Sequence, residues 1–209
     1  MASVGAAVTP RPHDLLKLST GIDAGAPPWA HTAVARTPWV VVRRATAPPG
    51  QVAVGVRGQT RSQRHATTIP IEAVEQIVTP ESLSDVRVAG PSDRPALRAL
   101  AAVRPHLDGT GLAWGPTGSV GFQLCTGSHS VTEVSDLDVV MRVSRLTPAV
   151  LQLFSRLRTA LSSAPSRIDC QIDTAAGAVS LTEIASRATQ LLLKGVDGPR
   201  LVAAEDLLR

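Results

Sequence analysis

Two regions in the first half of the chain alternate apolar and polar residues as β-strands do. Residues 39–44 and 51–57 are rich in valine and are separated by a Pro-Pro-Gly turn, so the pattern predicts a hairpin. Residues 14–18 form a short apolar segment that fits either a helix or a strand. We expect a short helix over residues 70–78, because Pro70 suits its first turn. The many prolines in residues 1–38 predict a loop-rich region.

The second half has longer periodic segments, and its helices and strands alternate. Thr147-Pro148 begins one helix as N-cap and first-turn proline. Ser180-Leu181-Thr182-Glu183 matches a capping box that starts another helix toward Leu193. Residues 119–125 fit either a strand or a short helix. The pattern predicts an α+β fold with helices packed on a mixed sheet. The predicted strands are 111–115, 136–143 and 167–173, and the predicted helices are 95–107, 147–161 and 180–193.

A polar stretch over residues 84–95 separates the two halves, and it contains Gly90-Pro91-Ser92-Asp93. Polar segments with proline and glycine are typical of linkers between domains. We therefore expect a smaller β-rich domain over residues 1–90, which carries a basic loop, and a larger domain over residues 91–209.

The amino-acid composition limits the kinds of protein that this chain can be. The 209 residues are 44% hydrophobic, which is enough for a sizeable core, and none is tyrosine. The formal net charge is +4, and every basic residue except Lys17 and Lys194 is an arginine, a residue that binds phosphate and carboxylate through paired hydrogen bonds. Cys125 and Cys170 are too few for a disulfide framework, and no apolar run is long enough to span a membrane. We expect a cytoplasmic protein with an anionic ligand or partner.

Two carboxylates stand two residues apart at the start of an apolar run. Asp136 and Asp138 share one face of the predicted strand, because alternate side chains of a strand point the same way. Carboxylates this close repel each other unless a cation lies between them. Asp169 or Asp173, on the polar face of a later strand, could complete a cluster of three. We favour Asp169, which lies between two apolar neighbours, and such a cluster binds one or two Mg²⁺ ions that bridge phosphate oxygens.

A glycine-rich turn precedes these carboxylates. Gly118 lets the backbone approach a ligand closely, and its N–H and the hydroxyl of Ser119 could both donate to a phosphate. A Gly-Ser pair alone is more often simply a turn. The turn, the paired carboxylates and a third carboxylate on a later strand form a more specific set, which indicates metal-assisted phosphoryl or nucleotidyl transfer.

Basic residues cluster after the predicted strand 51–57. This cluster is either an anion clamp for the phosphates of a large substrate or a solvated basic loop. Lys194 lies further along the chain, where it either reaches a leaving phosphate or is a cation at a helix end. The candidate substrate-binding residues of the cluster are Arg57, Arg61, Gln63 and Arg64.

The Gly-Ser turn, the Asp-x-Asp pair and the later carboxylate resemble the nucleotidyltransferase superfamily of the polymerase-β type. The longer segments 111–122 and 135–138 resemble the holo-acyl-carrier-protein synthases of malonate decarboxylase, also called phosphoribosyl-dephospho-CoA transferases. Residues 54–58 and 61–64 look similar as well, and the resemblance extends over nearly the whole chain. It implies a nucleotidyltransferase-like mixed sheet in the larger domain.

The resemblance also implies a reaction. A serine of the apo acyl carrier protein of malonate decarboxylase would attack the α-phosphate of triphosphoribosyl-dephospho-CoA, and pyrophosphate would leave. Asp136, Asp138 and Asp169 would bind Mg²⁺ or Mn²⁺, and Asp169 would help to deprotonate the attacking hydroxyl. Gly118 and Ser119 would hold the triphosphate. The cations that would neutralise its charge are Arg57, Arg61, Arg64 and Lys194.

Two other functions are compatible with these residues. The protein could be another nucleotidyltransferase, either of the citrate lyase type or one acting on a small molecule. It could instead be a non-catalytic module that binds RNA or another anion. Against RNA, aromatic residues are only 2% of the chain, which leaves little surface for stacking bases. We therefore expect neither a nucleic acid nor a membrane as partner.

Overall fold

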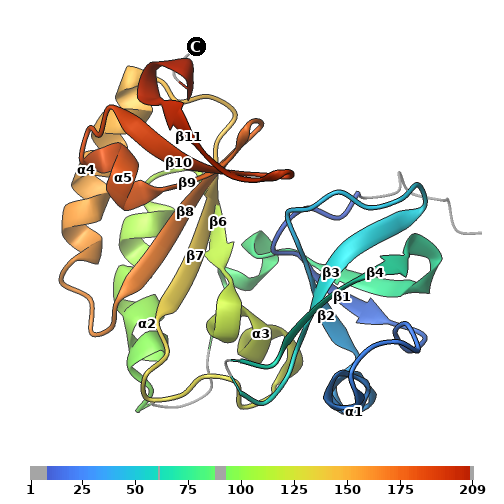
Figure 1. The fold of residues 1–209 in the computed structure, drawn as a ribbon. Coiled ribbons are helices and arrows are strands. Elements are labelled where there is room, and N and C mark those ends of the chain that lie inside the picture. The colour runs from blue at the N-terminus through green and yellow to red at the C-terminus, as the bar shows by residue number, and fades with distance from the viewer. Residues whose placement is uncertain (1–8, 61, 88–92, 208–209) are drawn as a thin grey trace, which may run out of the picture. The chain divides into compact units, whose positions relative to one another are not determined.

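The structure is a computed structural model that describes residues 9–60, 62–87 and 93–207. It contains helices and two separate sheets, so the predicted α+β class is confirmed. The chain divides into two compact units, Met1–Ile77 and Val78–Arg209 (Figure 1). Each unit has its own cluster of buried apolar side chains.

The first unit is built on a five-stranded sheet with the strand order β4-β3-β2-β1-β5. The predicted hairpin is present, because Val41 pairs with Gly55 and Val42 with Val54 in antiparallel register. Residues 15–18 form a strand rather than a helix. The strands are β1 (Leu15–Leu18), β2 (Trp39–Val42), β3 (Gln51–Arg57), β4 (Arg64–Pro70) and β5 (Val74–Val78).

Helix α1 (Pro28–Arg36) interrupts the region that we expected to be loop-rich. Pro28 occupies its first turn, where the missing N–H costs nothing because that group has no partner within the helix. Ala30 and Val34 are buried on its inner side, in the apolar cluster of the sheet. Prolines therefore mark the start of a helix here and not only loops.

The predicted helix over residues 70–78 is wrong. A single 3₁₀ turn, η1 (Ile71–Ala73), is followed at once by strand β5. β-Branched residues favour the extended chain, and the backbone N–H of Ser19 donates to the carbonyl of Ala73 at 2.9 Å. Pairing with a distant strand thus decides the conformation of this segment.

The second unit is built on a six-stranded mixed sheet with the strand order β11-β10-β9-β8-β7-β6. Strands β7 and β8 are parallel and are joined by helix α4, whereas the other pairs are antiparallel. The strands are β6 (Ala113–Pro116), β7 (Leu137–Arg142), β8 (Ile168–Thr174), β9 (Gly177–Ser180), β10 (Gln190–Gly195) and β11 (Gly198–Ala203). The helices are α2 (Pro95–Asp108), α3 (Gly118–Thr126), α4 (Pro148–Leu161) and α5 (Leu181–Ala185), with 3₁₀ turns η2 (Glu81–Leu83) and η3 (Ala204–Leu207).

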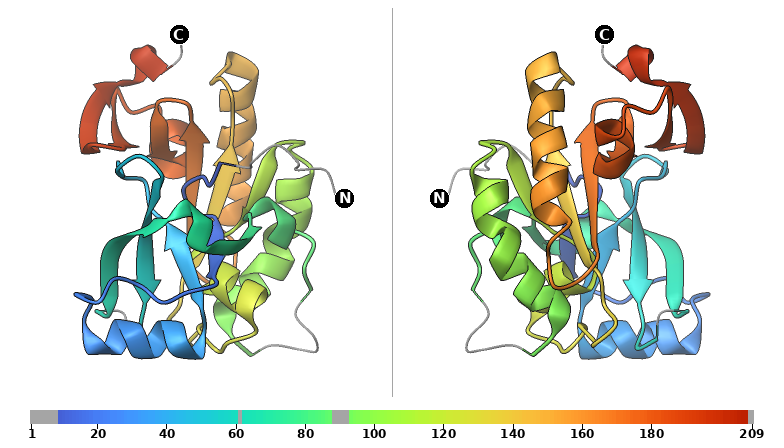
Figure 2. Two further views of the ribbon diagram at one scale, coloured as in Figure 1. Left: turned by 90° about the vertical axis from the view of Figure 1, so that its right-hand side faces the viewer. Right: turned by 90° about the vertical axis from the view of Figure 1, so that its left-hand side faces the viewer.

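Helices α2 and α4 cover one face of this sheet, as Figure 2 shows from the helix side. Leu137, Met141 and Ile172 are fully buried beneath them, in one apolar cluster with Leu107 and Phe154 of the two helices. The intervening residues of β7 and β8 therefore face the other way. Within the described residues, no helix is long and apolar enough to cross a membrane.

The predicted helix over residues 180–193 ends much earlier than expected. Ser180 caps it by accepting the N–H of Thr182, but α5 has only five residues and the chain continues into β10. Glu183 does not complete the capping box through its side chain; its Oε2 accepts the backbone N–H of Leu192 at 3.0 Å. Residues 119–125, which fitted either a strand or a helix, lie in α3.

Candidate active site

The turn between β6 and α3 holds the carboxylate of Asp138. Gly118 begins α3 with φ +58°, a conformation that residues with a side chain rarely adopt. A Cβ added at this position would overlap the Asp138 carboxylate. The backbone N–H of Thr117 donates to the carbonyl of Asp138 at 2.8 Å. The predicted glycine turn and one predicted carboxylate are therefore in direct contact.

Strand register places a second carboxylate beside the first. Asp138 of β7 is paired with Asp169 of the parallel strand β8, and both are half-buried. Paired residues of neighbouring strands lie about 5 Å apart and project from the same face. Asp136 immediately precedes β7, and its Oδ2 lies 3.8 Å from Nη1 of Arg167, which is largely exposed. Such an exposed pair is weak.

Asp173, the alternative third carboxylate, has a different environment. It lies four residues further along β8 and is only 8% exposed. Its Oδ2 accepts from Nη1 of Arg142 at 2.5 Å, and Nε of Arg142 donates to Glu81 at 2.5 Å. This buried ion-pair cluster attaches η2 to the sheet. Register thus puts Asp169, and not Asp173, next to Asp138.

Asp138 and Asp169 have the chemistry expected of ligands for a divalent cation. Among residues 9–60, 62–87 and 93–207, no three His, Cys, Asp or Glu side chains are grouped closely enough to hold a metal. Mg²⁺ is commonly bound by one or two carboxylates together with phosphate oxygens of the substrate. Asp138 and Asp169 supply the hard oxygen ligands that this ion prefers, so the pair fits it without a complete protein cage.

Backbone amides of α3 complete this side of the site. Ser119 is buried, and its carbonyl accepts the hydroxyl of Ser130 at 2.7 Å. Gln123 accepts the N–H groups of Ser130 and Val131, which holds the loop before β7 against the helix. Thr117, at the N-cap, makes no side-chain capping bond. The N–H groups of the first turn are therefore not capped by it, and uncapped amides attract anions.

The basic cluster belongs to the first unit. Arg57 and Arg64 are directly paired across β3 and β4, and Arg57 is half-buried whereas Arg64 is exposed. Gln63 accepts the backbone N–H groups of Gln59 at 2.9 Å and Thr60 at 3.2 Å, so its carbonyl oxygen shapes the loop. Arg61 lies outside the described residues.

Lys194 does not lie at a helix end, so that alternative is wrong. It is half-buried within β10, where it is paired with Ala178 of β9 and Pro199 of β11. Ala178 is in turn paired with Asp173, so Lys194 belongs to the same face of the sheet as the carboxylates. One strand lies between β10 and β8, which carries Asp169 and Asp173, and two lie between β10 and β7, which carries Asp138.

Two residues around Asp173 were not among the predicted site residues. Arg142 and Glu81 join Asp173 in the ion-pair cluster. The sequence did offer a signal for Arg142: it ends an apolar strand, four positions after Asp138, and so shares a face with that residue. For Glu81, which lies 61 positions before its partner, the sequence offers no signal.

Both cysteines are held as neutral thiols. Burial raises the pKa of Cys125 to about 11. Burial, and secondly the charge of neighbouring Asp169, raises the pKa of Cys170 further above its usual value. Neither is therefore an activated nucleophile.

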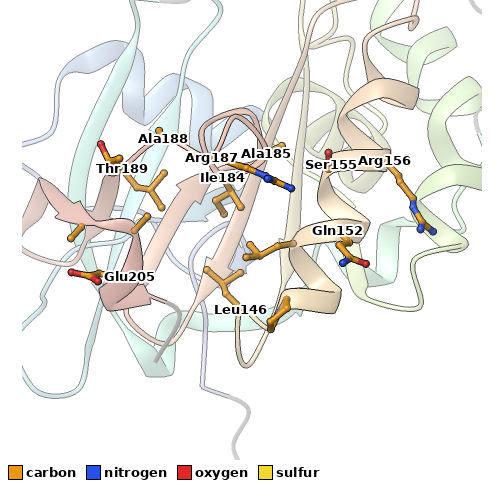
Figure 3. Close-up of a pocket in the computed structure, with 15 residues that line it drawn as sticks. Leu146, Gln152, Ser155, Arg156, Ile184, Ala185, Arg187, Ala188, Thr189 and Glu205 are labelled. Carbon is orange, nitrogen blue, oxygen red and sulfur yellow. The ribbon is translucent and has the colours of Figure 1, made fainter.

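A cavity of about 840 Å³ lies elsewhere in the second unit and holds none of the predicted site residues. Its lining comes from α4, from α5 and the residues that follow it, and from η3 (Figure 3). Leu146, Leu151, Ile184 and Leu191 form much of its apolar wall, and Arg187 belongs to the polar part.

Two family models match the chain. The model described as the phosphoribosyl-dephospho-CoA transferase MdcG N-terminal domain matches residues 11–80, and the model of the MdcG C-terminal domain matches residues 82–205. No solved structure matches.

The chain is also similar to curated proteins named phosphoribosyl-dephospho-CoA transferase. One from Pseudomonas putida is 47% identical over 196 residues, which cover 93% of this chain and 94% of the relative. One from Azotobacter vinelandii is 46% identical over 203 residues, and one from Pseudomonas aeruginosa is 41% identical over 196 residues. Each of these two alignments covers 92% of both chains. The resemblance seen in the sequence is thereby confirmed, and this chain is a transferase that belongs to the phosphoribosyl-dephospho-CoA transferase family.

Proposed function

We propose that this protein acts in the cytoplasm and transfers the phosphoribosyl-dephospho-CoA group of triphosphoribosyl-dephospho-CoA to a serine of the apo acyl carrier protein of malonate decarboxylase. Pyrophosphate is the other product. Family membership supports the transferred group. The observation that most supports the site is the carboxylate of Asp138 against the start of α3, with Asp169 beside it on the next strand.

The proposed step is a displacement at the α-phosphate. The serine oxygen forms a new bond to this phosphorus, and the bond from phosphorus to the oxygen of pyrophosphate breaks. Asp169 takes the serine proton in this proposal, because strand register places its carboxylate beside Asp138 at the site of transfer. The product is a phosphodiester between the carrier protein and the prosthetic group.

Asp138 and Asp169 are the proposed ligands of Mg²⁺ or Mn²⁺, together with Asp136, which immediately precedes β7 and would join the pair when the cation binds. A bound cation would supply charge stabilisation for the phosphate oxygens and orient the triphosphate. The amides of Gly118 and Ser119 at the start of α3 donate to phosphate oxygens in this proposal, beside the Asp138 carboxylate that lies against Gly118.

In this proposal, further positive charge for binding the donor comes from the basic residues that the sequence predicted as substrate-binding. Arg57 and Arg64 are cross-strand neighbours, which suits joint binding of one anionic group. We propose that they act with Arg61, Gln63 and Lys194 on the phosphates of the donor. Their contribution is stabilisation of the charge that grows on pyrophosphate as it leaves.

The test is an intact-mass measurement of the carrier protein after incubation with this protein, Mg²⁺ and triphosphoribosyl-dephospho-CoA. We expect a mass gain equal to the prosthetic group, its loss in Asp138→Asn and with a chelator, and its retention in the control Asp85→Asn, whose side chain is exposed. The proposal would be contradicted if the carrier protein gained no mass here, although another transferase modified the same carrier with the same donor. Modification of a citrate lyase carrier alone would change the acceptor, and salt-sensitive RNA binding without turnover would favour a binding module.

A further inference from the structure

Two leucines are exposed side by side on the β10–β11 hairpin. Leu192 is paired with Leu201 across the two strands, and the two residues are 38% and 66% exposed. Their neighbours Leu191 and Leu193, which point the other way, are 3% and 1% exposed and belong to the core. The inward face of β10 is therefore apolar and covered, whereas its outward face carries Leu192 between the polar residues Gln190 and Lys194. We name the exposed group the hairpin patch; it comprises Leu192, Val196, Pro199 and Leu201.

The hairpin patch lies on the same face of the sheet as the candidate active site. Lys194 is paired with Ala178, Ala178 with Asp173, and Asp173 with Arg142. Because alternate strand residues share a face, Leu192 belongs with Lys194, and Asp169 belongs with Asp173. Strand spacing and residue rise put the backbone of Leu192 roughly 10–15 Å from that of Asp169.

We propose that the hairpin patch is the docking surface for the acceptor protein of the transfer reaction. This inference rests on the proposed function, in which the acceptor is a folded protein that brings one serine to Asp138 and Asp169. A standard interface buries about 800 Å² on each partner and is therefore roughly 30 Å across. A protein centred near the carboxylates covers the patch as well.

The chemistry of the patch fits a protein better than it fits the donor. The donor carries several phosphates, whereas the patch offers two exposed leucines, a valine and a proline. Burial of exposed apolar side chains against a partner favours association, and complementary charge helps to select that partner. The geometry points to an acceptor surface with apolar residues flanked by carboxylates, which the net charge of +4 complements.

The test compares transfer kinetics of the wild-type protein and the double variant Leu192→Ser/Leu201→Ser. We expect the KM for the apo carrier protein to rise at least about tenfold, with kcat at saturating carrier and the dissociation constant of the donor unchanged. Ile71→Ser is the matched control, because Ile71 is also an exposed apolar residue, at 40%, but lies in the first unit. Leu201→Asp is expected to raise this KM more than Leu201→Lys, because the acceptor surface carries carboxylates.

Each contrary result has a distinct meaning. An unchanged KM for the carrier, with wild-type melting temperatures, would overturn the docking surface alone. If the variant binds the donor more weakly while its KM for the carrier is unchanged, the docking surface is also overturned, and the patch is assigned to donor binding. Conversion of a wild-type dimer to a monomer in light scattering would assign it to a second copy of the chain. Absence of transfer by the wild-type protein would overturn the proposed function, and this inference with it.

Discussion

The two faces of the six-stranded sheet are formed by the same strands, but one face is packed in the core and the other carries the candidate site. On one face, Leu137, Met141 and Ile172 are fully buried under α2 and α4. On the other, Asp138 and Asp169 lie next to each other at the turn that begins α3. Because alternate residues of a strand point to opposite faces, one segment can supply both the core and the chemistry. Substitutions on the two faces should therefore separate stability from activity.

The polar face is itself divided between two roles. Near the start of β7 and β8 it carries the half-buried pair Asp138 and Asp169. Four residues further along, Arg142 and Asp173 form a buried ion pair with Glu81. A buried carboxylate that already has a strong cationic partner is poorly suited to bind another cation. The same residue type on the same strand is thus proposed as reactive at one position and is structural at the other.

The largest expected effect separates these two aspartates. Asp169→Asn should lower transfer between about 100- and 10,000-fold, because it removes the proposed base, without lowering the melting temperature. Asp173→Asn should destabilise the protein by about 1–3 kcal/mol, because it leaves Arg142 with one carboxylate partner fewer, while the folded protein keeps its activity. Kinetics and thermal unfolding of both variants provide the measurement. The reverse pattern would assign the chemistry to Asp173.

On the covered face, Phe154→Ala should change stability alone. Phe154 is fully buried in the core under β7 and β8, so its truncation should cost about 3–5 kcal/mol. Denaturant unfolding measures that cost, and kcat at a temperature where the variant is folded should match the wild-type value. A large loss of kcat in the folded variant would show that the two faces are not independent.

Gly118→Ala should impair activity through a single methyl group. The new Cβ would displace the Asp138 carboxylate, and a shift of about 1 Å in a reacting group can cost about 100-fold in rate. Gly127→Ala is the matched control, because Gly127 also has a positive φ, +72°, but nothing lies within 4 Å of its added Cβ. Both variants carry backbone strain, so the difference in their rates measures the contact with Asp138. Equal rates would remove Gly118 from the site.

The smallest effect concerns the thiols. A pKa of about 11 for Cys125, against the usual 9.0, leaves about a hundredfold less thiolate at pH 8. Alkylation of the folded protein should therefore be slow at pH 8 and accelerate toward pH 11, whereas the unfolded chain reacts readily. The raised thiol pKa values also imply a stability contribution that is present below pH 9 and declines as the pH rises above it. Rapid alkylation of Cys170 at pH 8 would contradict its burial.

Local patterns predicted many of the elements around the site. Valine alternation predicted the β2–β3 hairpin, and the Thr147-Pro148 signal predicted the start of α4, where Thr147 accepts the N–H of Val150. Motif recognition also identified the family, since a family motif preserves the residue types and the order of its parts. These properties are local to a few residues or follow from their order along the chain.

Other elements depended on contacts with distant residues. Beside β1, a segment that starts like a helix becomes strand β5. Residues 190–195 become β10 because they pair with β11 and because the backbone N–H of Leu192 donates to Glu183. Long-range pairing outweighs local propensity in such segments, and no local pattern reports it.

The sequence by itself determined the alternation that divides the strands into an apolar and a polar face, the Gly-Ser turn and the family of the protein. Only the tertiary structure decided which carboxylates are neighbours. The parallel register of β7 and β8 put Asp169 beside Asp138 and left Asp173 to Arg142. Register depends on how two strands, separated in sequence by a helix, pack together. The sequence could therefore supply the candidates, and packing selected among them.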